Sequence, residues 1–253
     1  MSTVEILICL RWLSYCINES CMNKMKCGLL ILLVSMLPAV SIAGNAMLDT
    51  DRLLVDDPLT AESWDAHWKV LVGDWGWEGD SLKGVENPEQ NHHAGAGRIE
   101  DMTSGILELE FRMDDSRQVQ FGYDYYTEEK KDHLMRASIE ATGLSVRAGK
   151  GWAKDTSMKS IGEKVPMTFE SGRWYKGKIE FHKDNLIVHI NDRMVFYGIA
   201  SISQEVPKNR ITLTARGTAS FRNVKLWSGE LKSNWERTRK SLAKKFPSIK
   251  EGS

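Results

Sequence analysis

The stretch Leu53-Leu54-Val55-Asp56-Asp57-Pro58-Leu59, followed by Trp64 and Trp68, opens the region that decides the fold of this chain. Trp75-Gly76-Trp77 continues the opening, and Phe221-Arg222-Asn223-Val224-Lys225-Leu226-Trp227 closes the region. Between these segments, short alternations of apolar and polar residues are separated by turn residues, which is typical of strands. The two segments therefore predict one all-β domain and mark its first and last strands.

Period-two alternation is the evidence that these strands are antiparallel. It occurs in five segments, at residues 107–113, 118–125, 133–141, 186–190 and 211–215. Strict alternation buries one side chain and leaves the next on a polar face. Asn191-Asp192 and Lys183-Asp184-Asn185 supply residues that tolerate tight hairpin turns. We expect an antiparallel jelly-roll β-sandwich over residues 48–229, with roughly 12 strands.

Helical sequence is confined to two places. Residues 60–67 predict one or two helical turns with Thr60 as the N-cap. Residues 233–245 predict a longer helix within a basic C-terminal tail, residues 230–253, with a thin apolar stripe formed by Trp235, Leu242 and Phe246. We expect this helix to pack on the rim of the sandwich, and a membrane-surface or partner-binding helix is the alternative.

Residues 1–43 differ in character from the rest of the chain. Lys24 and Lys26 precede an apolar run over residues 28–40, and Ser41-Ile42-Ala43 ends in the small-x-small pattern of a cleavage site. This predicts a secretory signal peptide cut near Ala43. The run of about 13 residues is shorter than the ~20 that span a bilayer, so a retained anchor is the weaker alternative.

The predicted signal places the mature protein outside the cytoplasm, secreted or periplasmic, without stable membrane insertion after cleavage. Residues 1–21 do not fit the signal pattern. We interpret them as an over-long gene start, with Met22 or Met25 as the initiator.

All four cysteines lie in this leader, at Cys9, Cys16, Cys21 and Cys27. The mature chain would therefore contain neither a disulfide nor a thiolate metal ligand. A domain of about 210 residues is large enough to be stable through its core alone.

The charges balance, with 34 basic and 34 acidic residues in the whole chain. Removing the three basic and two acidic residues of the leader leaves 31 and 32. A near-neutral chain lacks the positive field that drives nucleic-acid binding, so we expect no nucleic-acid partner. We also expect no cofactor.

The opening segment resembles that of concanavalin A-like lectin/glucanase sandwiches. Gly172-Arg173-Trp174 resembles the G-x-W strand of that superfamily, His189-Ile190-Asn191-Asp192 stands where it often has V-N-G, and Phe221-Arg222-Asn223-Val224-Lys225-Leu226 looks like its closing strand. The most similar branch is the 3-keto-disaccharide hydrolase domain family, over most of residues 50–228. The resemblance implies a jelly roll that engages carbohydrate, with hydrolysis of 3-keto-glycosides as an implied activity.

Polar residues that alternate with the expected core residues are the candidates for catalysis. Cross-strand neighbours lie about 4.5–5.5 Å apart, and paired carboxylates in glycoside cleavage use separations of about 5–9.5 Å. The candidate catalytic carboxylates are Glu108, Glu110, Asp124 and Glu140, and the candidate arginines for a sugar hydroxyl pair or an oxyanion are Arg112 and Arg136. Ordinary surface ion pairs are the alternative interpretation.

Aromatic residues give a second signal for sugar binding, because sugar rings stack on exposed aromatic faces. We predict that Tyr126 and Trp152 are exposed platforms and that Gln120 and His133 complete the substrate-binding set. The remaining large aromatics are assigned to the core, including Trp64, Trp68, Trp75, Trp77, Trp174 and Trp227.

The adjacent pair His92-His93 invites a metal site together with His133 or Asp132. Adjacent imidazoles rarely reach one ion well, and the spacing matches no zinc motif. We therefore expect a surface loop and no metal.

Three functions remain open from the sequence. The first is an exported enzyme that hydrolyses 3-keto-glycosides, using one of the candidate carboxylates as a base and an arginine for the oxyanion. The second is a non-catalytic carbohydrate-binding module that uses Tyr126 and Trp152. The third is a structural or interaction domain of the cell surface that makes contacts through the basic tail.

Overall fold

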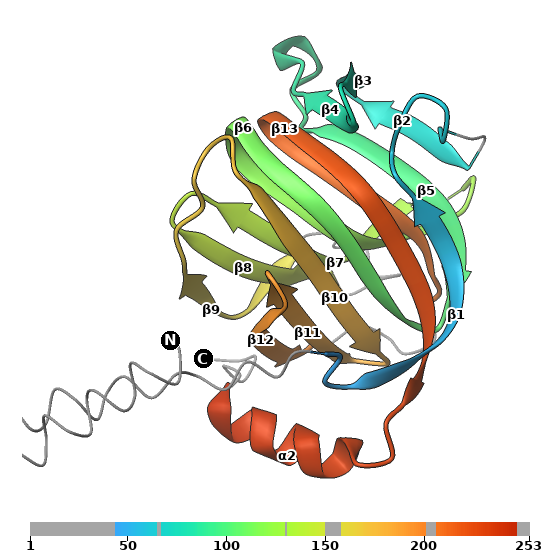
Figure 1. Cartoon of the computed structure of the whole chain (residues 1–253), viewed down its shortest axis with the longest axis vertical. Helices are drawn as coiled ribbons and strands as arrows, with labels where there is room; N and C mark the ends of the chain where they lie inside the picture. The colour runs from blue at the N-terminus through green and yellow to red at the C-terminus, as the bar shows by residue number, and fades with distance from the viewer. Residues whose placement is uncertain (1–43, 65–66, 130, 150–157, 201–205, 247–253) are drawn as a thin grey trace, which may run out of the picture. The chain divides into compact units, whose positions relative to one another are not determined.

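The computed structural model describes residues 44–64, 67–129, 131–149, 158–200 and 206–246. Residues 41–253 form one compact unit (Figure 1). The predicted signal, Ala43 and Trp152 lie outside the described residues.

The described elements are β1 (Leu48–Asp57), β2 (Trp68–Val72), β3 (Asp74–Glu78), β4 (Ser81–Val85), η1 (Pro88–Gln90), β5 (Ala94–Met102), β6 (Ser104–Tyr126), β7 (Lys131–Glu140), β8 (Gly143–Ala148), β9 (Lys159–Pro166), β10 (Trp174–His182), β11 (Asn185–Ile190), β12 (Arg193–Ile199), β13 (Lys208–Leu231) and α2 (Trp235–Lys245).

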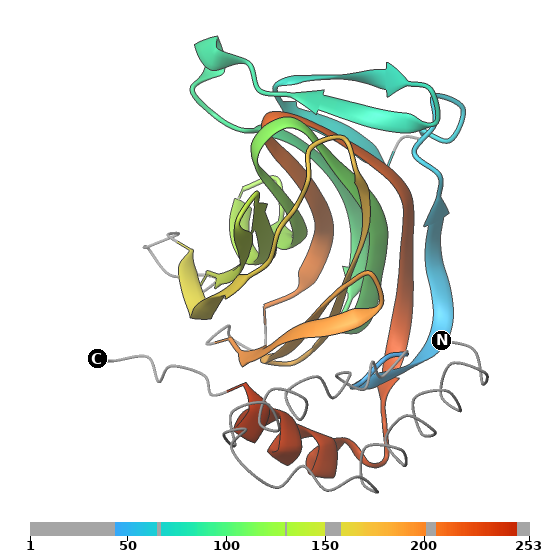
Figure 2. The same cartoon turned by 60° about the vertical axis from the view of Figure 1, so that its left-hand side comes forward.

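Two long strands, β6 and β13, organise the sheet and curve through the molecule side by side (Figures 1 and 2). They pair with each other antiparallel from Arg210↔Asp124 to Ser228↔Gly105. We expected separate strands at 107–113 and 118–125, and again at 211–215 and 221–227, and that expectation is wrong. Register shifts occur around Gly217, whose φ is +96°. They let β6 and β13 bend without either strand ending.

Both β6 and β13 run through two halves of the sandwich, and each half adds its own strands to them. In the first half the order is β12-β11-β10-β6-β13-β4-β3, and β1 pairs with the C-terminal part of β13. In the second half β5 pairs with the N-terminal part of β13, and β7, β8 and β9 continue outward from the C-terminal part of β6. The pairing is antiparallel throughout, which confirms the predicted all-β sandwich with a short C-terminal helix.

The hydrophobic core lies between the halves. Phe111 and Phe121, from the two parts of β6, have ring centroids 5.6 Å apart, and Tyr123 meets Phe181 of β10 at 4.3 Å. A Cβ on Gly177 would lie 2.4 Å from the Phe121 ring, so the glycine permits this close approach. The alternation predicted for residues 118–125 is confirmed, because Val119, Phe121 and Tyr123 are all buried.

The opening segment has a structural role centred on Asp57, at the end of β1. Its carboxylate accepts hydrogen bonds from the Leu59 amide at 2.8 Å, the Ser63 hydroxyl at 2.6 Å and Trp68 Nε1 at 2.7 Å. These bonds fix the path from β1 to β2. The helix expected at residues 60–67 is a turn where the chain is described, and Thr60 Oγ1 accepts from the Ser63 amide at 3.3 Å.

The predicted C-terminal helix is confirmed as α2, which begins at Trp235 and ends at Lys245. Trp235 and Leu242 are buried and pack with Met47, Leu48 and residues of β11 and β12 in a second apolar cluster. Among the described helices, none has the length and apolar character needed to cross a bilayer. Two core assignments are wrong, because Trp77 is 43% exposed on the β3–β4 hairpin and Trp174 lies on the outer surface beside Arg112 and Arg222.

Candidate functional site

A polar layer lies in the second half on the side of the sheet opposite the core, and the residues in its three rows are buried except His133. Residues paired across neighbouring strands point to the same side of a sheet. Three rows on β13, β6 and β7 form the surface that we call the polar face: Thr214–Gln120–Ser138, Thr212–Gly122–Arg136 and Arg210–Asp124–His133. Strand β8 extends the first two rows with Ser145 and Arg147.

Asp124 is the centre of the polar face and is fully buried. Arg136 Nη2 donates to its two carboxylate oxygens at 2.7 and 3.0 Å. From the opposite strand, Arg210 Nη2 donates at 3.1 Å and Thr212 Oγ1 at 2.7 Å, both to Oδ2. One carboxylate therefore holds two arginines that come from strands on either side of it.

The charge state of Asp124 follows from these contacts. Burial by itself would raise the pKa of Asp124, but the charge of Arg136, the hydrogen bond and charge of His133 and the charge of Arg210 outweigh burial and hold this pKa well below its ordinary value. The carboxylate is therefore ionised at neutral pH. It can neither supply a proton nor serve as an effective base, because four hydrogen bonds already occupy its oxygens.

His133 lies beside this cluster, with its side chain 44% exposed. Its Nδ1 is 2.8 Å from Arg136 Nη2 and 3.3 Å from Asp124 Oδ1. One nitrogen cannot accept from the first and donate to the second at once. The ring tautomer decides between the two contacts, since a protonated Nδ1 donates to Asp124 and an unprotonated Nδ1 accepts from Arg136.

Gln120 carries the hydrogen-bond network along the polar face. Its Nε2 donates to Ser138 Oγ at 2.9 Å and to Gln118 Oε1 at 2.7 Å, while its Oε1 accepts from Thr214 Oγ1 at 3.2 Å. Gln118 Nε2 then donates to Glu140 Oε1 at 3.1 Å. A continuous network thus runs over the face to Glu140, whose other oxygen accepts from Lys164.

Two buried donors on the polar face lack a hydrogen-bond partner among the described residues. The side chains of Arg136 and Arg210 are each 5% exposed, and the Nε–H of each has no hydrogen-bond partner among the described residues. An unpaired buried donor costs about 1–3 kcal/mol, so an acceptor oxygen supplied from outside would stabilise it. The Arg210 guanidinium also lies 4.9 Å from the centre of the partly buried Tyr126 ring.

The structure brings together six of the ten residues that the sequence singled out. Gln120, Asp124, Tyr126, His133, Arg136 and Glu140 all belong to this network or contact it. Sequence reasoning did not name Arg210, Thr212 and Thr214. The alternation could have indicated them, because these polar residues alternate with Ile211, Leu213 and Ala215, which belong to the core.

Glu108, Glu110 and Arg112 lie elsewhere, on the outer surface of the first half. Glu108 accepts from Lys176 at 3.0 Å, Glu110 from Arg222 at 2.8 Å, and Arg112 contacts Asp114. In register, each glutamate has a basic residue on both neighbouring strands. This is the ion-pair arrangement of an ordinary sheet surface.

The expected cross-strand pairing of carboxylates is wrong. Asp124 and Glu140 share the polar face, but Glu140 bonds to Gln118, six residues along β6 from Asp124. Gln118, Gln120 and Arg136 lie between the two carboxylates along the hydrogen-bond network, so Asp124 and Glu140 are not directly opposed across neighbouring strands.

The His92-His93 pair lies in the turn before β5, with His92 exposed and its Nδ1 2.8 Å from the His93 carbonyl oxygen. Burial lowers the pKa of His93, opposed by Glu86 and reinforced by Arg216 and Arg136. No group of three or more metal-ligating side chains occurs among the described residues.

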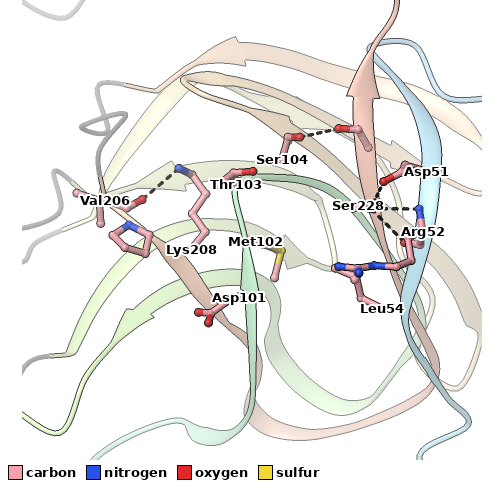
Figure 3. A pocket seen from close by; sticks show the side chains of 12 residues that line it. Asp51, Arg52, Leu54, Asp101, Met102, Thr103, Ser104, Val206, Lys208 and Ser228 are labelled. Atoms are coloured by element: carbon pink, nitrogen blue, oxygen red, sulfur yellow. Dashed lines mark hydrogen bonds between the residues drawn. The ribbon is translucent and has the colours of Figure 1, made fainter.

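A pocket of about 640 Å³ lies at one end of the sandwich (Figure 3). It is lined by β1, the β5–β6 turn and both ends of β13, and includes the buried Lys208. Its serine hydroxyls already join strands, because Ser104 donates to the Gly229 carbonyl at 2.6 Å and Ser228 to Asp51 at 3.0 Å. The pocket contains none of the predicted site residues, so the polar face is the stronger candidate.

Comparisons with known proteins identify the architecture. No family model and no curated protein sequence matches the chain. A Bacillus subtilis protein of unknown function with a galectin-like fold superposes with a TM-score of 0.56 at 12% identity, covering 72% of this chain and 99% of that one. The chain has a concanavalin A-like, galectin-like β-sandwich fold.

Two further solved structures share this concanavalin A-like fold. The carbohydrate-binding module CBM66 from Bacillus subtilis gives a TM-score of 0.53 at 14% identity, over 64% of this chain and 96% of that one. The Bacillus licheniformis β-glucanase gives 0.53 at 9% identity, over 72% and 100%. At these identities the likeness concerns the fold and assigns no residue a role.

Proposed function

We propose that this protein binds carbohydrate on the polar face. The observation that carries the proposal is the hydrogen-bond network that joins Gln120, Asp124 and Arg136 and lies beside the partly exposed side chains of His133 and Tyr126. Sugar hydroxyls are both donors and acceptors and can join such a network. The carbohydrate-binding module and the glucanase among the structural relatives support the same class of ligand.

The proposed binding surface has a buried floor and a more exposed rim. Asp124 and Arg136 belong to the floor, whereas Tyr126 and His133 are partly exposed. Tyr126 offers an aromatic ring to the apolar side of a sugar, and floor residues fix its orientation through hydrogen bonds. Hydrogen bonds already hold the floor side chains in place, so these side chains lose little conformational entropy when a ligand binds, which favours specificity.

We infer binding without hydrolysis as the better function for this face. Hydrolysis of a 3-keto-glycoside needs an available base near the sugar. Of the two predicted carboxylates on the face, Asp124 is saturated by hydrogen bonds and Glu140 is bonded to Lys164 and Gln118. We expect no turnover of a 3-keto-disaccharide. Turnover that is lost in Asp124→Asn would instead favour the hydrolase.

Binding can be tested by affinity electrophoresis against a panel of neutral and acidic polysaccharides. We expect Tyr126→Ala and His133→Ala to weaken binding roughly three- to tenfold, the range expected for one aromatic or polar contact. Trp174→Ala is the matched control, because Trp174 stacks with Arg112 and Arg222 on the outer surface. Unchanged affinity in both polar-face variants, or equal loss in the control, would contradict the proposal. Trp152→Ala can be measured alongside.

We further propose that the protein is exported and that its signal is removed near Ala43. The support is the leader sequence, with its basic residues, short apolar run and small-x-small end, and the confinement of all four cysteines to it. N-terminal sequencing of protein recovered from an extracytoplasmic fraction should begin at or near Gly44. Recovery of the uncleaved chain from the cytoplasm would contradict export.

A further inference from the structure

The charge of the polar face points to a narrower class of ligand than sugars in general. Arg136 and Arg147 are cross-strand neighbours on β7 and β8, and Arg210 and Arg216 lie on β13, on the other side of β6. The acids placed on this face by the register are Asp124 and Glu140. The first is neutralised by two arginines, and the second is paired with Lys164 at 2.6 Å. The face therefore carries a positive excess although the whole chain is neutral.

Two of these arginines, Arg147 and Arg216, have no ion-pair partner within 4 Å among the described residues, although Arg216 is close enough to Glu140 to help lower the pKa of that carboxyl. Arg147 Nη2 donates to the Met158 carbonyl at 3.0 Å, which satisfies a donor and leaves its charge uncompensated. Arg216 is exposed, and neither it nor Arg147 forms an ion pair with a described residue. Arg136 and Arg210 add the two buried Nε donors. Guanidinium groups bind planar carboxylates through paired hydrogen bonds, an arrangement that a lysine ammonium cannot make.

We propose that the saccharide bound by the polar face is anionic, with carboxylate or sulfate groups that pair with Arg147 on β8 or with Arg216 on β13. This inference rests on the proposed carbohydrate binding at the same face. A uronic acid fits the chemistry best, because its ring supplies hydroxyls for the Gln120 network and its carboxylate supplies the counter-charge.

The experiment compares polymers that differ in charge alone. Binding of the full chain to polygalacturonate is measured by affinity electrophoresis beside its fully methyl-esterified form, at low and high salt. We expect about tenfold weaker binding to the ester, the effect of losing one charge-assisted contact, and weaker binding to the acid as salt rises. Dextran and dextran sulfate form the second pair. Binding to dextran sulfate without binding to polygalacturonate would support an anionic ligand and assign the anion as a sulfate ester.

Arginine variants locate the effect. Arg147→Gln and Arg216→Gln should each reduce affinity for the acidic polymer several-fold and leave binding to the ester unchanged, whereas Arg222→Gln on the outer surface should alter neither. Equal affinity for acid and ester would overturn the anionic inference and leave carbohydrate binding standing. Binding to poly-glutamate as tight as to polygalacturonate would also overturn it, because the surface would then attract any polyanion. Failure to bind any polysaccharide would overturn the proposed function itself.

Discussion

At the scale of single residues, Asp124 shows how one buried charge organises a surface. A buried ion pair contributes little net stability, because desolvation opposes the attraction, but removing one partner leaves a buried charge uncompensated. Asp124 is the shared partner of Arg136 and Arg210, which would face each other without it. Its main effect is therefore to hold two arginines in fixed positions on the polar face.

Asp124→Asn should destabilise the protein by about 3–5 kcal/mol at neutral pH, the cost of breaking a buried charge pair. Because the pKa of Asp124 is lowered in the folded state, its contribution is present above the unfolded pKa near 4 and is lost as pH falls below that value. The difference between wild type and variant in urea denaturation should accordingly shrink below about pH 4.

Glu140→Gln on the same face is the control for this experiment. Its carboxylate is 44% exposed and paired with Lys164, so the change should cost less than about 1 kcal/mol. A comparable loss in both variants would contradict a special role for the buried carboxylate.

At the scale of elements, the buried pair Glu180–His189 joins β10 and β11 to the beginning of β1. Glu180 accepts from the amides of Ala46 and Met47 at 2.8 Å and from the amide of Leu48 at 3.0 Å. His189 Nε2 lies 2.7 Å from Glu180 Oε1. Burial opposes ionisation, but His189 and these amides lower the pKa of Glu180. The first described residues are thereby fixed to the sandwich by a carboxylate more than a hundred residues away.

Glu180→Gln should loosen this junction, because an amide places a donor where the backbone N–H groups need an acceptor. We expect a stability loss of roughly 3–5 kcal/mol. Amide hydrogen exchange at Met47 and Leu48 should accelerate more than at residues of β6. Glu230→Gln, at an exposed position, is the control and should change neither quantity. Unchanged exchange at Met47 and Leu48 would contradict the predicted role.

Elements were predictable from the sequence to the extent that their signals are local. Alternation identified the buried side of β6 and β7, and the Trp235–Leu242 stripe identified α2, because both patterns depend on residues close in sequence. The continuity of β6 and β13 was not predictable, because the bends are accommodated by register shifts between distant strands. The same limit explains why Arg210 was missed, since only the β13–β6 register places it beside Asp124.

At the scale of the whole molecule, the neutral composition conceals an uneven charge distribution. The outer surface pairs Glu108 and Glu110 with basic neighbours, whereas the polar face has arginines in excess of its acids. A net charge read from composition therefore could not reveal a local excess of one sign. Glu110 and Asp124 were both candidate catalytic carboxylates in the sequence, yet Glu110 lies in an ion pair on the outer surface and Asp124 is buried on the polar face.

The central position of β13 has a consequence for how the protein is made. This strand pairs with β1, β4, β5 and β6, yet it is the last strand in the chain, and Leu48 must find Leu231. At roughly 5–20 residues per second, the ribosome needs on the order of 10–30 s after β1 before β13 emerges. Pairings between such distant segments also form slowly. Assembly of the sheet therefore waits until β13 has been synthesised, and the nascent polypeptide remains without its central strand until then.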